Sequence, residues 1–162
     1  MTQPQFYTIG VYGLTAEEFF NKLTQNEIDT FVDIRRRRAV RGSKFSFVNS
    51  KRLQNKLAEL EINYLHILEL APTNEIRNMQ KEVDKINSVP KRKRNELGET
   101  FISEYKNQIL SHYDMNEMLS QLNKISSSKA VLFCVEKEAS ACHRSLVTEK
   151  LSNDFGLKPI NL

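Results

Sequence analysis

The sequence of 162 residues contains no tryptophan, only five glycines and only two cysteines. Two cysteines, Cys134 and Cys142, are too few for a disulfide scaffold in a chain of this length, so we expect two thiols in a reducing compartment. The chain does not open on a basic segment followed by an apolar run, which predicts that no signal peptide is present. The most continuous apolar run, residues 130–135, is far too short to span a bilayer. We therefore expect a cytoplasmic protein that does not enter a membrane.

Sequence motifs for common cofactors are also missing. Neither the GxGxxG pattern of dinucleotide-binding folds nor the GxxxxGK[ST] phosphate loop occurs, so ATP and NAD have no support and the cofactor is unknown. The cysteines form no CxxC pair with the usual spacing of zinc ligands. Cys134, Cys142 and His143, with Glu136 as a fourth ligand, give only a weak zinc signal. We therefore predict no metal site.

Basic residues are concentrated in two segments, although the net charge of +4 is modest. Nine basic residues and no acidic residue lie between Arg35 and Lys56, and a second cluster spans Lys91–Arg94. Such clusters indicate an anionic partner, either a small molecule or a nucleic acid. We favour a functional role for the arginines of residues 35–41, because they directly follow a buried strand. For Lys91–Arg94 we favour a solvated surface.

Short apolar segments alternate with segments of helical periodicity. Strands are expected at residues 6–11, 30–34, 63–68, 129–136 and 158–162. Helices are expected after Thr15, which forms a capping box with Glu18, after Asn49 or Ser50, between Pro72 and Pro90, and over residues 99–110, 116–125 and 142–154. This alternation predicts one α/β domain over residues 1–162, with a mainly parallel sheet flanked by helices. In such sheets, ligands bind outside the carboxyl ends of the strands.

Three polar residues fall at these strand ends. Asp33 lies late in an apolar strand and needs a partner there. It either pairs with a nearby arginine or caps a turn, or it serves as a base, a metal ligand or a substrate anchor. Cys134 and Glu136 lie on one face of another strand. Cys134 is either a small core residue or a nucleophile, and Glu136 at a partly dry strand end is suited to general acid or base catalysis.

Residues Cys142, His143 and Arg144 open a predicted helix. A helix N-terminus presents free N–H groups and the positive end of the helix dipole, and Arg144 adds a planar donor fork. These features predict anion binding, although Arg144 could instead pair with Asp33 or Glu136. His143 is either a proton shuttle or a hydrogen-bonded structural residue.

Several ordered segments together resemble the uncharacterised domain-of-unknown-function family 488, over nearly the whole chain. The segments are YTIG (7–10), FVDIR (31–35), VRGS (40–43), FVNS (47–50), INYLH (62–66), LAPT (70–73) and CVE (134–136) with CHRS (142–145). The resemblance implies an α/β sandwich-like fold and carries no settled activity. It places recurrent polar positions at Asp33, Arg35, Arg41, His66, Thr73, Arg77, Glu136, Cys142, His143 and Arg144.

We favour an enzyme, a hydrolase or transferase acting on a phosphorylated substrate such as a nucleotide or nucleic acid. The predicted roles are catalysis for Asp33, Glu136 and His143, anion binding for Arg35, Arg41 and Arg144, and pocket lining for His66, Thr73, Arg77, Cys134 and Cys142.

Two alternatives stay open. One is a non-catalytic nucleic-acid-binding module, in which Phe45 and Phe47 either stack on bases or pack under their loop. The other is thiol chemistry at Cys134 or Cys142. Along the chain, a strand that ends in Asp-x-Arg is followed by a later strand with a Cys, a loop, and a helix that begins with Arg-Ser. This layout is similar to that of rhodaneses. However, nine residues separate Cys134 from Arg144, so the short thiolate loop of that fold is not reproduced.

Overall fold

A computed structural model describes residues 3–162, so Met1 and Thr2, at the start of the predicted domain, lie outside the described residues. In the described part, one parallel sheet has the strand order β3-β2-β4-β1-β5. The predicted α/β fold with a mainly parallel sheet is confirmed. The strands are β1 Gln5–Ile9, β2 Thr30–Asp33, β3 Asn63–His66, β4 Lys129–Phe133 and β5 Ile160–Asn161.

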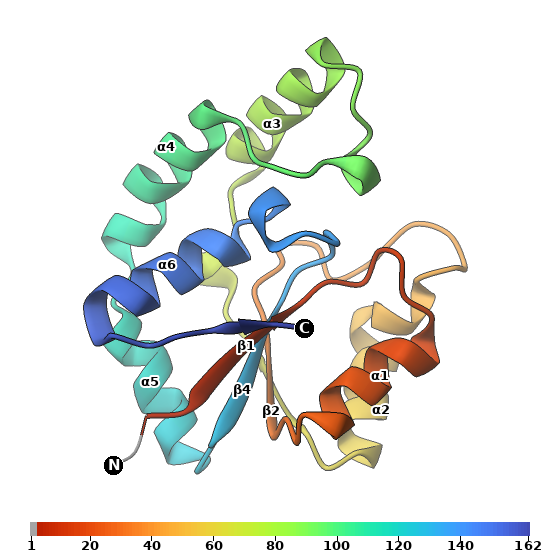
Figure 1. The fold of residues 1–162 in the computed structure, drawn as a ribbon, viewed down its shortest axis with the longest axis vertical. Coiled ribbons are helices and arrows are strands. Elements are labelled where there is room, and N and C mark those ends of the chain that lie inside the picture. The colour runs from red at the N-terminus through yellow and green to blue at the C-terminus, as the bar shows by residue number, and fades with distance from the viewer. Residues whose placement is uncertain (1–2) are drawn as a thin grey trace.

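Helices cover both faces of this sheet (Figure 1). On β4, Val131 and Phe133 face one apolar cluster, whereas Ala130 and Leu132 face the other, so the strand is buried on both sides. Helices α1 and α2 cover the first face, and α4, α5 and α6 cover the second. The helices are α1 Ala16–Gln25, α2 Ser50–Glu59, α3 Asn74–Ile86, α4 Glu99–Gln108, α5 Met115–Lys124 and α6 Arg144–Phe155.

Two helix starts test the capping predictions. The hydroxyl of Thr15 accepts a hydrogen bond from the backbone N–H of Glu18 at 3.2 Å, so the predicted cap of α1 is confirmed. Asn49 occupies the cap position of α2, but its side chain makes no cap hydrogen bond. Its Oδ1 instead accepts from the backbone N–H of Val40 at 2.7 Å. Asn49 is therefore the cap residue of α2, one of the two expected positions, while its side chain holds the loop after β2.

The segment between α3 and α4, residues 87–98, is held against the loop that follows β4. The N–H of Leu97 donates to the carbonyl of Ser140 at 3.1 Å, and a guanidinium N–H of Arg94 donates to the carbonyl of Ala141 at 2.9 Å. We call residues 90–97 the strap, which Figure 1 shows as the stretch that returns from the end of α3 towards the start of α4. None of the helices in residues 3–162 has the length and apolar character needed to cross a bilayer.

Candidate functional site

The carboxyl end of β2 holds a closed ion pair between Asp33 and Arg35. Nε and Nη2 of Arg35 donate to the two carboxylate oxygens of fully buried Asp33 at 2.9 and 2.8 Å. The hydroxyl of Tyr64 donates to the same carboxylate at 2.7 Å. The guanidinium of Arg35 also stacks on the ring of Phe133, 4.6 Å from its centroid. Asp33 and Arg35 are thus both bound to other groups of the chain. Of the alternatives given for Asp33, the structure shows pairing with a nearby arginine.

Arg144, at the first turn of α6, binds backbone rather than a carboxylate. Its Nη1 donates to the carbonyl oxygens of Cys134 at 3.3 Å and Glu136 at 2.6 Å, and its Nη2 donates to the carbonyl of Lys137 at 3.1 Å. The side chain is only 2% exposed. Arg144 therefore fixes the path of the chain directly after β4. It pairs with the backbone of Glu136 and not with its carboxyl group.

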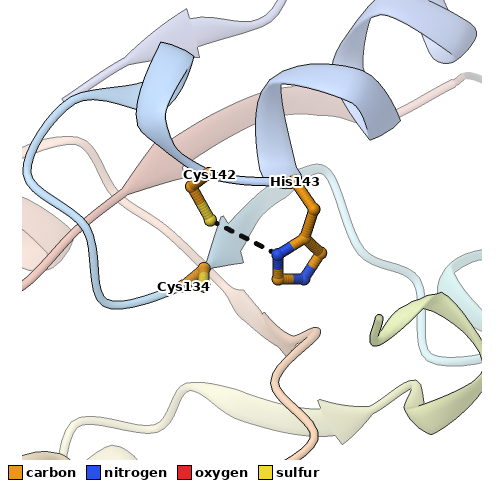
Figure 2. Close-up of side chains that lie close together, drawn as sticks. All are labelled: Cys134, Cys142 and His143. Atoms are coloured by element: carbon orange, nitrogen blue, oxygen red, sulfur yellow. Dashed lines mark hydrogen bonds between the residues drawn. The ribbon is translucent and has the colours of Figure 1, made fainter. Parts of the chain in front are cut away.

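Two thiols and an imidazole meet at the end of β4. The ligand atoms of Cys134, Cys142 and His143 all lie within 4.8 Å of one another, and the three side chains are buried (Figure 2). Nδ1 of His143 lies 3.5 Å from the sulfur of Cys142, and its Nε2 lies 2.8 Å from the carbonyl oxygen of Ile34. Because a carbonyl oxygen only accepts, Nε2 carries a proton and Nδ1 faces the sulfurs.

This cluster separates the pKa values of the two thiols. Burial opposes ionisation of Cys134, but the hydrogen bond from Cys142 and the charge of His143 bring the pKa of Cys134 well below its ordinary value. Burial, together with the hydrogen bond and the negative charge of Cys134, holds the pKa of Cys142 well above its ordinary value. Burial lowers the pKa of His143, yet the charge of Cys134 outweighs it and the net shift is upward. The surroundings therefore favour ionisation of Cys134 over ionisation of Cys142.

Glu136 links the thiols to the strap. One carboxyl oxygen lies 3.1 Å from the sulfur of Cys134, and the other lies 3.1 Å from Nη2 of Arg94 and 3.6 Å from Nζ of Lys91. The residue is 5% exposed. Burial, followed by the charge of Cys134, raises the pKa of Glu136, whereas Lys91 and Arg94 oppose the shift. The surroundings thus disfavour the ionised form of this carboxyl group relative to its form in water.

The basic cluster Lys91–Arg94 closes over this carboxyl group, so the prediction of a solvated surface is wrong for Arg94. Its side chain is 9% exposed and bridges two carboxylates, Asp84 at 2.7 Å and Glu136 at 3.1 Å. The guanidinium of Arg92 lies 5.1 Å from the ring centroids of both Tyr12 and Phe45. Sequence reasoning missed these contacts because, apart from Asp84, the partners of the strap lie about 40 residues or more away in the chain, and only the charge cluster itself gave a signal.

The sequence matches the family described as Domain of unknown function DUF488 over residues 15–151. The chain belongs to this family. No curated protein and no solved structure matches it. The assignment from the resemblance is confirmed, and any statement about the activity of this DUF488 protein rests on its own site.

The remaining predicted site residues of the DUF488 chain lie around this core. Nε2 of His66 lies 2.8 Å from the carbonyl oxygen of Arg35, and the hydroxyl of Thr73 caps α3. Arg77, on α3, is half-buried, and burial and the charge of Arg37 lower its pKa. The negative charges of Cys134 and Glu136 act on Arg77 in the opposite direction. Arg41 is exposed in the loop after β2.

The site of this DUF488 protein is closed by its own side chains. Cys134, Glu136, Cys142 and His143 are each at most 6% exposed. A hollow of about 700 Å³ lies elsewhere, between α1 and α2, and its lining includes none of these four residues. The thiols and the carboxyl group of Glu136 are therefore largely closed to solvent in this structure, and Lys91 and Arg94 of the strap contact that carboxyl group.

Proposed function

We propose that this protein is an enzyme that acts on a phosphorylated substrate at the cluster around Glu136. The observation that carries the proposal is the position of that buried carboxyl group, between a thiol at 3.1 Å and two cations at 3.1 and 3.6 Å. A carboxyl group in such surroundings suits proton transfer to or from a substrate. The nearby cations suit recognition of phosphate oxygens.

Anion recognition is assigned to Lys91 and Arg77. The side chain of Lys91 is 44% exposed, so its ammonium reaches solvent while it contacts Glu136. Arg77 is half-buried on α3, and burial, followed by the charge of Arg37, lowers its pKa. A phosphate bound between Lys91 and Arg77 would offset the repulsion between Arg77 and Arg37. Arg35 and Arg144, the cations favoured by the sequence, already bind groups of the chain, so we assign them positioning roles together with Asp33.

Binding of inorganic phosphate and of adenosine 5′-monophosphate, followed by calorimetry, tests the anion site. Arg77→Ala and Lys91→Ala are each expected to weaken binding about tenfold or more, the range of a charge-assisted hydrogen bond. Lys124→Ala is the matched control, because Lys124 is exposed at the end of α5, outside the cluster. Equal weakening by all three variants would mean that the ions respond only to net charge.

Turnover tests the role of Glu136. With p-nitrophenyl phosphate and adenosine 5′-monophosphate as probes, Glu136→Gln should lower kcat about 100-fold or more, the usual contribution of a general acid or base. Phosphate binding should be retained, because this substitution leaves Lys91 and Arg77 in place. Full activity in the variant removes Glu136 from the chemistry, and a wild-type protein that neither binds nor turns over the probes overturns the proposal.

The exposed basic loop after β2 supports a second candidate, binding of nucleic acid through phosphates. Arg37, Arg41 and Lys44 are exposed there, whereas Phe45 and Phe47 are buried. The two aromatic rings pack under their loop, which is one of the two alternatives given for them. Because they are buried, they do not offer a surface on which bases can stack. Binding of a single-stranded oligonucleotide that falls steeply with salt favours this candidate. Binding that Arg41→Ala leaves unchanged counts against it.

The thiol alternative is supported by the convergence of Cys134 and Cys142 within 4.8 Å. Alkylation by iodoacetamide tests it. Selective loss of turnover on modification of Cys134 favours a nucleophilic thiol, and full turnover by Cys134→Ser dismisses it.

A further inference from the structure

Three ligand atoms converge on one point beneath the strap. They come from the loop directly after β4 (Cys134) and from the two residues before α6 (Cys142 and His143), and all lie within 4.8 Å of one another (Figure 2). Two soft thiolates and an imidazole are a donor set that zinc accepts in proteins. All three residues are buried, next to the end of β4 and the start of α6.

The orientation of His143 is the one that a metal ligand needs. Its Nε2–H donates to the carbonyl of Ile34 at 2.8 Å, so in the neutral ring that binds a metal the lone pair of Nδ1 is directed at the sulfurs. Histidines that bind metals almost always donate their other ring N–H to such an acceptor. The separation of Nδ1 from the sulfur of Cys142 is 3.5 Å. Tetrahedral zinc with bonds of about 2.3 Å to sulfur and about 2.0 Å to nitrogen places these atoms about 3.5 Å apart.

Charge balance supports the same ion. Two thiolates and a neutral imidazole cancel the charge of Zn²⁺, so the metal core is neutral, as a buried position requires. The carboxyl group of Glu136 lies beside this set, 3.1 Å from the sulfur of Cys134, and its other oxygen is compensated by Arg94. Glu136 therefore lies beside Cys134, one of the three ligands, and is not among the ligand atoms that converge.

We propose that Cys134, Cys142 and His143 bind Zn²⁺, with a water in the fourth position beside Glu136. Zinc binding at this site is independent of the proposed function, but a catalytic role of the zinc rests on the proposed function. In that role, the zinc-bound water gives a proton to Glu136 and its oxygen bonds to the phosphorus of the substrate. The bond from phosphorus to the leaving oxygen breaks, and Glu136 returns the proton to that oxygen.

Metal uptake by the reduced full chain tests the site. Zinc titrated against a chromophoric chelator should bind with a stoichiometry of one, and Co²⁺ should give tetrahedral d–d bands with thiolate charge-transfer absorption. His143→Gln, Cys134→Ser and Cys142→Ser should each weaken zinc binding more than about 100-fold, because outer-shell partners alone account for 10–100-fold. His112→Gln is the matched control, since His112 is exposed, and should bind zinc normally.

A second measurement uses the wild-type chain and does not depend on the folding of variants. Zinc should protect both thiols from alkylation, and a chelator should restore their reactivity. Zinc that leaves either thiol reactive, or an absence of zinc binding, overturns the site. Glu136→Gln should retain zinc within about threefold, and a loss like that of His143→Gln would overturn the open fourth position by making Glu136 a ligand.

The two proposals fail separately. Zinc binding without phosphate binding or turnover keeps the metal site and removes the proposed function. Phosphate binding and turnover by a protein that takes up no zinc, or that is unaffected by chelators, keeps the proposed function and removes the metal site.

Discussion

Two carboxyl groups lie beside the two ends of β4 and differ in the groups that surround them. Asp29 lies at the amino end of the sheet, and Glu136 lies at the carboxyl end. Asp29 accepts hydrogen bonds at 2.7–2.9 Å from the hydroxyls of Thr30, Ser127 and Ser128 and from the backbone N–H groups of Ser128 and Lys129. Glu136 lies among a thiol and two cations under the strap.

The pKa values move in opposite directions for this reason. Burial raises the pKa of Asp29, but the donors of Ser127, Ser128 and Thr30 outweigh it and lower the value below 3.8. Burial raises the pKa of Glu136 and its cations do not fully offset the shift. The carboxylate of Asp29 is satisfied by neutral donors and joins strands, whereas the proposed role of Glu136 in proton transfer calls for a desolvated carboxyl group with a raised pKa. The predictions below test whether this division holds.

The largest effect on stability is expected at the carboxyl end, from backbone packing rather than from charge. A Cβ added at Gly10 would lie 1.9 Å from the carbonyl oxygen of Glu136, which Arg144 holds in place. Gly10→Ala should lower the free energy of unfolding by about 3 kcal/mol, the upper range for overpacking. Gly13→Ala, with φ of +88° but only an ordinary contact of 3.7 Å to the side chain of Lys137, should cost about 1 kcal/mol. Urea unfolding of both variants measures the difference, and equal losses would contradict the close approach.

Asp29→Asn should destabilise the fold by about 2 kcal/mol, because several donors lose an ionised acceptor. Asp154→Asn, in an exposed pair with Lys150 at 2.9 Å, is the control and should cost less than about 0.5 kcal/mol. Phosphate binding should be unchanged in both variants. A loss of phosphate binding in Asp29→Asn would break the division between the two ends of the sheet.

The contribution of Asp29 should also depend on pH. Its pKa is lowered in the folded state, so the contribution is fully present above the ordinary value of 3.8 and is lost as the pH falls through the folded value. Between about pH 5 and pH 3, the wild type should therefore lose stability more steeply than Asp29→Asn. Urea unfolding across this range gives the comparison, and parallel curves would show that Asp29 is not the group responsible.

Among the substitutions at the carboxyl end of the sheet, the smaller change in stability is expected for Glu136→Gln. The carboxyl group is already disfavoured as an anion, and Arg94 keeps its ion pair with Asp84 at 2.7 Å. The free energy of unfolding should change by less than about 1 kcal/mol. A loss as large as that of Asp29→Asn would make Glu136 a structural residue and weaken the proposed function.

Much of the fold follows from local sequence. The capping box of Thr15 and Glu18, the apolar strand 129–133 and the glycine that ends α6 at Gly156 all depend on neighbours in the chain. The parallel sheet then follows from the alternation of strands and helices. Strand ends were predicted one to three residues too long, because apolar side chains continue past the last ladder hydrogen bond.

The candidate site was predicted only in part. Residues near the ends of β2 and β4 were identified because polar residues within apolar strand sequences are unusual. The roles of Arg35 and Arg144 depend on their partners, which the local sequence pattern does not reveal. Arg35 binds a carboxylate, and Arg144 binds three carbonyl oxygens. Asp84, Lys91 and Arg94 were not predicted as site residues, because a helix and a basic strap look solvated until the chain places them over Glu136.

By itself, the sequence determined the layered α/β architecture and the edge of the sheet where reactive groups gather, since periodicity and chain direction are local properties. Only the tertiary structure decided which charges are already bound and which face the thiols. Ion pairs and hydrogen bonds join residues that are distant along the chain, such as Arg94 with Glu136 and His143 with Ile34. Their energies depend on separation and burial in space, which no pattern in the sequence encodes.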